Sequence, residues 1–157
     1  MNPLTLTYFE PKGGPGTIGF TPTAPGKIIP LQITPQNILQ KDAFMVAEEG
    51  VELSVFFQRK LGTGFFGGEG FIMQKLVGNE MAFAEVDGEV VEINLAPGEM
   101  IDVDTTHVAL FEASVDMEIR FVKGFKNVIF GGEGLFLTRL TGPGKVWLQT
   151  MTIANLA

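Results

Sequence analysis

The five residues Phe66-Gly67-Gly68-Glu69-Gly70 recur unchanged as Phe130-Gly131-Gly132-Glu133-Gly134, 64 positions later in the chain. Such a repeat indicates duplicated supersecondary units, each of which buries an apolar face against its neighbour. Glycine adopts a positive φ without steric cost, so both copies are expected to be tight turns. The glycines expected to have this structural role are Gly67, Gly68, Gly70, Gly131, Gly132 and Gly134.

The similarity between the two copies extends beyond the pentapeptide. At the same separation of 64 positions, Leu76 corresponds to Leu140. Further upstream the separation becomes 62, so that Ile28 corresponds to Val90. The sequence places this slip of two residues near residues 109–113, where a longer turn would accommodate it.

A third, partial copy lies near the N-terminus, where Gly14-Pro15-Gly16 matches Gly142-Pro143-Gly144. The match predicts a hairpin whose strands cover residues 4–9 and 17–20. The whole chain, 1–157, is therefore expected to be one all-β domain made of repeats. The expected repeats are residues 2–65, residues 66–129 and the opening hairpin of a third unit, 130–157.

Short apolar runs separated by Gly and Pro fill the rest of the chain, and none keeps helical spacing over three turns. Residues 115–121 alternate between apolar and charged types, which is typical of a half-buried strand. Pro30 indicates an edge strand, because proline donates no ladder hydrogen bond. This pattern predicts a β-sandwich or barrel. The expected strands are 28–33, 38–40, 44–47, 51–55, 70–77, 81–86, 90–95, 100–103, 107–111, 115–121, 135–140 and 145–152.

Composition excludes several classes of function. The 157 residues carry a net charge of −7 and contain no cysteine, so disulfides and thiolate ligands are absent. The acidic balance opposes nucleic-acid binding outside a locally basic groove. No apolar run reaches the ~20 residues of a transmembrane helix. Because the N-terminus also lacks a signal-peptide pattern, a cytoplasmic protein is expected.

The repeated pentapeptide, together with Thr-Gly-Pro-Gly-Lys-Val-Trp-Leu-Gln-Thr at 141–150, resembles a known family. The segments 96–99 and 104–108 resemble it too, so that the similarity covers nearly the whole chain. The family is named for altered inheritance of mitochondria, and its fold is like that of the tryptophan RNA-binding attenuation protein (TRAP-like).

The resemblance implies three tandem β-rich units with pseudo-threefold symmetry, related to double-stranded β-helix folds. It implies no established enzyme activity. This chain is shorter than the family pattern and is expected to lack a segment that would complete the third unit, either as a naturally short member or as a fragment of a three-unit protein. We therefore expect its open strand edges to be covered by another copy of the chain, which makes it a homo-oligomer.

The residues that could carry catalysis are few. A P-loop needs Gly-Lys-Ser/Thr after its glycines, but Phe71-Ile72 follows here. His107, the only histidine, cannot build a metal site of several histidines. Neither Ser54 nor Ser114 lies in a Gly-x-Ser-x-Gly elbow. We expect His107 to be a half-buried packing residue, and the protein to have no catalytic residue, metal or cofactor.

Three carboxylates lie close together in sequence, at Glu99, Asp102 and Asp104. Paired carboxylates can bind Ca²⁺ or serve as acid and base. We interpret them instead as the solvated face of a strand in an acidic protein.

The loop before each glycine-rich copy mixes cations with large apolar residues, at 58–65 and 122–129. Exposed apolar groups rimmed by charge are typical of sites for a partner protein, an anionic ligand or a membrane surface. The alternative is that the apolar residues pack between repeats while the cations are solvated. The cations that would form this surface are Arg59, Lys60, Lys123 and Lys126.

The leading hypothesis is a non-enzymatic protein-binding or assembly module. RNA binding is an alternative that rests on fold analogy alone. Small-molecule binding in the mouth of a β-barrel is a further alternative.

Overall fold

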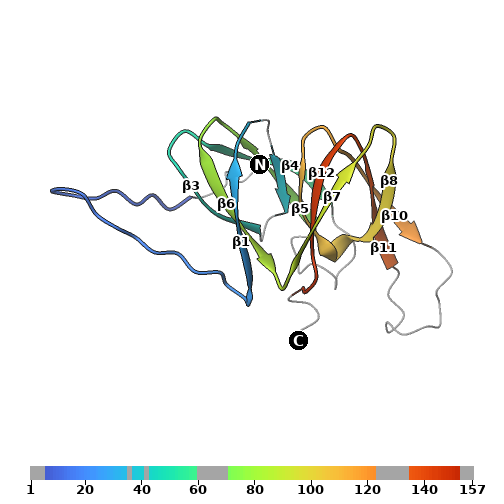
Figure 1. Ribbon diagram of the computed structural model, residues 1–157, viewed down its shortest axis with the longest axis horizontal. Helices are drawn as coiled ribbons and strands as arrows, with labels where there is room; N and C mark the ends of the chain where they lie inside the picture. The colour runs from blue at the N-terminus through green and yellow to red at the C-terminus, as the bar shows by residue number, and fades with distance from the viewer. Residues whose placement is uncertain (1–5, 35–36, 41–42, 60–70, 123–134, 153–157) are drawn as a thin grey trace.

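The structure is a computed structural model that describes residues 6–34, 37–40, 43–59, 71–122 and 135–152. These ranges form strands, turns and short 3₁₀ segments (Figure 1). The all-β class predicted from the sequence is confirmed. The elements are β1 (Gly26–Gln32), β2 (Asn37–Gln40), β3 (Phe44–Ala47), β4 (Glu52–Arg59), β5 (Phe71–Val77), β6 (Met81–Asp87), β7 (Val90–Leu95), β8 (Met100–Asp104), η2 (Thr105–His107), β9 (Val108–Glu112), β10 (Asp116–Val122), β11 (Leu135–Thr141) and β12 (Gly144–Gln149).

The strands form three antiparallel sheets. A six-stranded sheet has the order β4-β5-β2-β9-β12-β7, and two three-stranded sheets have the orders β1-β6-β3 and β10-β11-β8. The six-stranded sheet contributes side chains to two separate apolar clusters, each shared with one of the smaller sheets. It therefore lies between them, as Figure 1 shows.

Both halves of the chain use the same scheme of strand pairing. In the first half β6 pairs with β1 and β3, while β5 pairs with β4 and β2. In the second half β12 pairs with β7 and β9, while β11 pairs with β10 and β8. The antiparallel pair β2–β9, in which Ile38 lies opposite Phe111, joins the halves into one sheet. The division into three units, the pseudo-threefold symmetry and the TRAP-like detail stay predictions.

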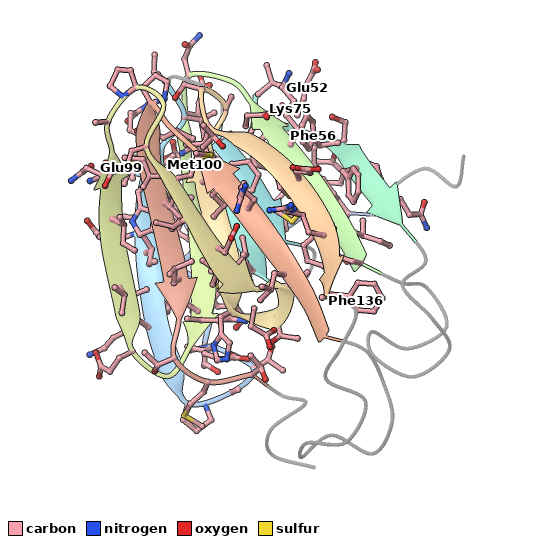
Figure 2. The ribbon with its side chains drawn as sticks, turned by 90° about the vertical axis from the view of Figure 1, so that its right-hand side faces the viewer. Glu52, Phe56, Lys75, Glu99, Met100 and Phe136 are labelled. Carbon is pink, nitrogen blue, oxygen red and sulfur yellow. The ribbon has the colours of Figure 1, made fainter. Side chains whose placement is uncertain are left out.

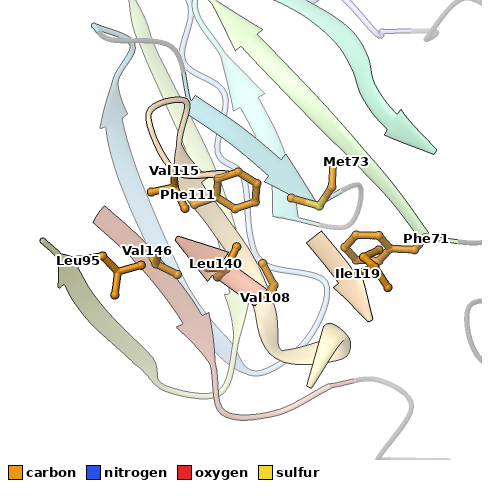
Figure 3. Packing of buried hydrophobic residues seen from close by; sticks show 9 residues of the cluster. All are labelled: Phe71, Met73, Leu95, Val108, Phe111, Val115, Ile119, Leu140 and Val146. Atoms are coloured by element: carbon orange, nitrogen blue, oxygen red, sulfur yellow. The ribbon is translucent and has the colours of Figure 1, made fainter. Parts of the chain in front are cut away.

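Alternation along β9 explains how one sheet serves two cores. Phe111 belongs to the cluster against β10-β11-β8, which Figure 3 shows, and its neighbour Leu110 belongs to the cluster against β1-β6-β3. Successive side chains of a strand point to opposite faces, so each face of the central sheet is apolar. Trp147 of β12 packs in the same cluster as Leu110.

A β-bulge interrupts the same place in each half. The pairing of β3 with β6 shifts between Phe44 and Val46, and that of β9 with β12 shifts between Val108 and Leu110. The extra residues are Met45 and Ala109, which are 64 positions apart. A bulge reverses the alternation, which allows both Val108 and Phe111 to face one core.

The turn after the bulged strand also recurs. The Glu48 carboxylate accepts a hydrogen bond from the backbone N–H of Met81, and the Glu112 carboxylate accepts one from that of Lys145. The backbone carbonyls of these two glutamates accept the N–H of Val51 and of Val115. Each glutamate therefore fixes the strand that follows against the nearby hairpin.

The strand registers correct the position of the two-residue slip. Leu31 lies opposite Ala82, and Ile93 lies opposite Val146, so β1 and β7 are related by 62 positions while β6 and β12 are related by 64. Strands β2 and β8 are already related by 64, because Leu76 faces Asn37 and Leu140 faces Ile101. The slip thus lies between the first and second strands of each half, and the prediction of residues 109–113 is wrong.

The predicted N-terminal hairpin is also wrong for the residues described. Residues 6–25 contain no strand, and they form an arm that runs out from the sheets and returns (Figure 1). A two-stranded hairpin has little stability without a third strand or a packing surface. Among the described strands, none pairs with residues 6–25 to supply one. By contrast, Pro30 does lie in an edge strand, since β1 ends its sheet.

Candidate interaction surface

The four cations singled out in the sequence lie almost wholly outside the described residues. Arg59 is the last residue of β4, where its backbone lies opposite Phe71. Lys60, Lys123 and Lys126 are not among the described residues, and neither are the six turn glycines of the repeated pentapeptide.

The strands that flank these two loops are counterparts. One loop joins β4 to β5, whose last pair is Arg59 with Phe71, and the other joins β10 to β11, whose last pair is Val122 with Leu135. The predicted loops therefore connect equivalent hairpins in the two halves. The interaction surface that they were predicted to form stays a prediction.

The N-terminal arm, residues 6–25, is the most exposed apolar segment described. Tyr8 is 83% exposed and Phe9 is 60% exposed. The Phe9 and Phe20 rings meet edge to face with centroids 5.7 Å apart, which holds the outgoing and returning stretches together. At its base the Glu85 carboxylate accepts bonds from the backbone N–H and the hydroxyl of Thr23, at 2.7 and 2.9 Å.

Two strand edges form a second exposed feature. β3 ends the sheet β1-β6-β3, and β8 ends the sheet β10-β11-β8. Met100, at the start of β8, is 58% exposed, and Figure 2 shows it beside Glu99. Strand edges offer unpaired backbone groups to another strand.

The outer face of β10-β11-β8 is charged, as the alternation of residues 115–121 predicted. Asp116, Glu118 and Arg120 are exposed, while Val115 and Ile119 are buried. The confirmed alternation leaves this face to solvent and ion pairs.

A cross-strand ion pair fixes Asp102 on that face. Arg139 donates from Nε and Nη2 to the two carboxylate oxygens, each at 2.7 Å. These hydrogen bonds lower the pKa of Asp102 below its ordinary value and raise the pKa of Arg139. Asp102 is therefore a structural partner of Arg139 rather than a member of a paired-carboxylate site.

The neighbouring carboxylates are engaged in the same way. Asp104 caps η2 by accepting bonds from the backbone N–H and the hydroxyl of Thr106, at 2.9 and 2.7 Å. Glu99 accepts the backbone N–H of Ala96 at 2.8 Å. Across the described residues no three His, Asp or Glu side chains gather as a metal site would require.

His107 ends η2 and is half-buried, as predicted. Its Nδ1 lies 2.7 Å from the carbonyl oxygen of Gln149. Because a carbonyl only accepts, Nδ1 donates. Neither Ser54 nor Ser114 is a hydrogen-bond partner of His107 in the described part of the chain. The histidine therefore ties η2 to the end of β12 and belongs to no serine–histidine arrangement.

The exposed arm and the contrast between edge strands were not predicted from the sequence. The incompleteness of the N-terminal copy could have indicated the arm. This copy contains the hairpin motif but neither the glycine-rich turn nor the strands that would pair with the hairpin. The edges carry no such signal, because which strand ends a sheet depends on the order of pairing.

Comparison with known proteins identifies the family to which this chain belongs. The family described as mitochondrial biogenesis AIM24 matches residues 2–151. The chain belongs to this family. The resemblance identified from the sequence is thus confirmed.

The relatives show a fold without an assigned activity. An uncharacterised protein of Streptococcus pyogenes serotype M6 is 27% identical over 146 residues. The match covers 92% of this chain and 58% of the relative. A crystal structure of an S. pyogenes protein from a structural genomics programme aligns with a TM-score of 0.71 and 23% identity. It covers 86% of this chain and 59% of the other, and at this identity it shows the fold alone.

This chain therefore spans somewhat more than half the length of these two S. pyogenes proteins. In the described residues no helix is both long enough and apolar enough to cross a membrane.

Proposed function

We propose that this AIM24-family chain is a non-enzymatic protein-binding and assembly module. The observation that carries the proposal is the arm 6–25, whose aromatic side chains are exposed and in which Phe9 packs on Phe20. Leaving apolar area in water costs about 25 cal/mol per Å². Such a segment contributes little to folding, and contiguous exposed apolar groups are typical of contact surfaces.

The chemistry of the polar residues supports the non-enzymatic part of the proposal. The carboxylates near β8 each hold a cation or a backbone N–H, and His107 bonds a carbonyl. RNA binding has less support, because Lys27, Arg139 and Lys145 are engaged by carboxylates. A basic groove would leave such cations free for phosphates.

The test compares partners retained by the natural protein with those retained by the double variant Phe9→Ser, Phe20→Ser. We expect the variant to lose partners and keep its thermal unfolding midpoint, since the arm adds little to the cores. The matched control is Val91→Ser, which removes an apolar side chain of similar exposure from β7. Unchanged capture by the arm variant would contradict the proposal.

The loop cations form a second part of the proposal. Arg59, Lys60, Lys123 and Lys126, changed together to Glu, are expected to weaken capture of acidic partners. Retention of every partner by this variant would remove the loops from the binding surface. The expected cytoplasmic location is tested separately, by fractionation of cells that make the protein.

A further inference from the structure

Two strands, β2 and β9, have more neighbouring strands than their counterparts in the other half, β8 and β3. Each strand of the first half has a counterpart in the second, from β1 with β7 to β6 with β12. Within the chain β2 pairs with β9. Their counterparts β8 and β3 lie at sheet ends and each have one neighbour among the described strands. The other edge strands, β1, β4, β7 and β10, end their sheets in both halves alike.

The edge β3 also lacks the charged side chains and prolines that protect many edge strands from pairing. Its sequence, Phe-Met-Val-Ala, contains no charge and no proline. The edge β1 carries Lys27 and Pro30, and the edge β10 carries three charged residues. Charged side chains and prolines are the usual means of blocking association at an edge. Their absence from β3 leaves it suited to pairing.

Burial of counterpart residues follows the same contrast. Leu110 and Trp147, which face the first half, are buried at 0% and 7% exposure. Their counterparts Val46 and Phe83 lie opposite each other in β3 and β6 and are only half-buried. Leu110 and Trp147 are buried because the first half packs against them. Among the described residues, no neighbouring half packs against Val46 and Phe83 in the same way.

The same holds on the other side of the molecule. Met73 of β5 is fully buried in the cluster that the second half supplies. Its counterpart Leu137, on β11, is half-buried. The first half thus presents β3, the counterpart of β9, and the second half presents β8, the counterpart of β2. These two exposed strands correspond to the two that form the β2–β9 junction.

We infer that β3 of one copy pairs with β8 of a second copy and repeats the β2–β9 junction between chains. The internal register, transferred by 64 positions, places Val46 opposite Val103, Ala47 opposite Asp102 and Glu48 opposite Ile101. This inference rests on the proposed assembly role and specifies its surface. The contact is head-to-tail, because each copy offers β3 to one neighbour and β8 to another.

The pairing occurs between chains and not within one. Figure 1 places β3 and β8 at opposite ends of the molecule, with the central sheet between them. A head-to-tail contact continues either to a closed ring or to an open chain of copies.

The experiment uses the absence of cysteine in the natural chain. Two single variants, Val46→Cys and Val103→Cys, are prepared separately and mixed under mild oxidation. Opposed residues of antiparallel strands lie within the Cα range of ~4.4–6.8 Å that a disulfide accepts. We expect a disulfide-linked pair in the mixture, and much less of it in either variant alone.

The control mixture combines Val46→Cys with Val91→Cys, whose residue lies on the exposed edge strand β7. It is expected to give no linked pair above background. Equal linkage in the control, or linkage of Val46→Cys with itself, would overturn the head-to-tail pairing. So would a mixture that stays unlinked.

Light scattering gives an independent measurement on the natural chain. We expect the average mass to rise with concentration and to return to that of one chain in Val46→Lys, which places a charge at the junction. A natural chain that stays a monomer at every concentration overturns the inference. The two cysteine variants should still form the linked pair when each also carries Phe9→Ser and Phe20→Ser, so failure of the arm proposal and failure of this one are distinguishable.

Discussion

Single carboxylates in this protein serve the fold by holding a specific partner. Asp102 is held by two hydrogen bonds from Arg139 across β8 and β11. Glu48 and Glu112 bond backbone N–H groups at equivalent turns. An acidic composition therefore does not by itself create an ion-binding site.

The Asp102–Arg139 pair makes a testable statement about pH. Hydrogen bonding by Arg139 is the main cause of the lowered pKa of Asp102, and the charge of Arg120 is a lesser cause. We expect Arg139→Gln to raise the pKa of Asp102 toward its ordinary 3.8, and Arg120→Gln to raise it less. Carboxyl ¹³C chemical shifts followed through an acid titration measure both values.

The sign of the associated stability change follows from the lowered pKa. Unfolding restores the ordinary pKa of Asp102, so the pair stabilises the fold at neutral pH. That contribution is lost as pH falls from 3.8 through the lowered value of the folded state. An Arg120→Gln variant whose Asp102 shifts as much as in Arg139→Gln would contradict the assignment.

At the scale of elements, strands with their own local pattern were predicted well. The alternation of residues 115–121 gave β10 to within a residue, and its buried face follows from period two. The hairpin predicted in the arm was wrong, because its β-favouring residues and Gly-Pro turn satisfy the local pattern although no sheet is there for them to join. Strand formation needs a partner, and partners are a property of the whole chain.

The candidate surface was predicted only in part for the same reason. Cations and apolar residues in the loops at 58–65 and 122–129 can be read from the sequence. The exposure of β3 cannot, because Phe44–Ala47 has the composition of an interior strand and its edge position depends on sheet order. Its counterpart β9 is similarly apolar and is interior.

The arm is expected to be the first element cut by a protease. Lys12 lies in a stretch without ladder hydrogen bonds, whereas Lys27 lies in β1, paired with β6 and with Glu89. Proteases cut segments that open at little cost. Of the basic residues in described segments, Lys12 should be the first cut by trypsin, with mass spectrometry identifying the products.

The matched control for this prediction is Lys12→Gln, which removes the site and leaves the strands unchanged. It should abolish the early product and leave the later ones. Cleavage after Lys27 before Lys12 would show that β1, and not the arm, is the less stable element.

At the scale of the whole molecule, the six-stranded sheet contributes to both cores, so we expect them to unfold as one cooperative unit. Leu110 and Phe111 are adjacent in β9 but belong to different clusters, so displacement of this strand disrupts both. We therefore expect the halves not to be independent domains in the thermodynamic sense. Unfolding is expected to be a single transition, as for most small domains.

Trp147 is the only tryptophan, and it packs from the second half into the cluster beside the first half's sheet β1-β6-β3. Its fluorescence therefore reports separation of the halves, while circular dichroism reports loss of all strands. We expect the two signals to coincide in urea, and Leu110→Ala to lower the free energy of unfolding by about 2–5 kcal/mol in both. The control Val91→Ala, at an exposed position, should change it by less than about 0.5 kcal/mol.

Fluorescence that changes well before circular dichroism would mean that the β2–β9 junction opens while both halves stay folded, and that the central sheet is a contact between two domains.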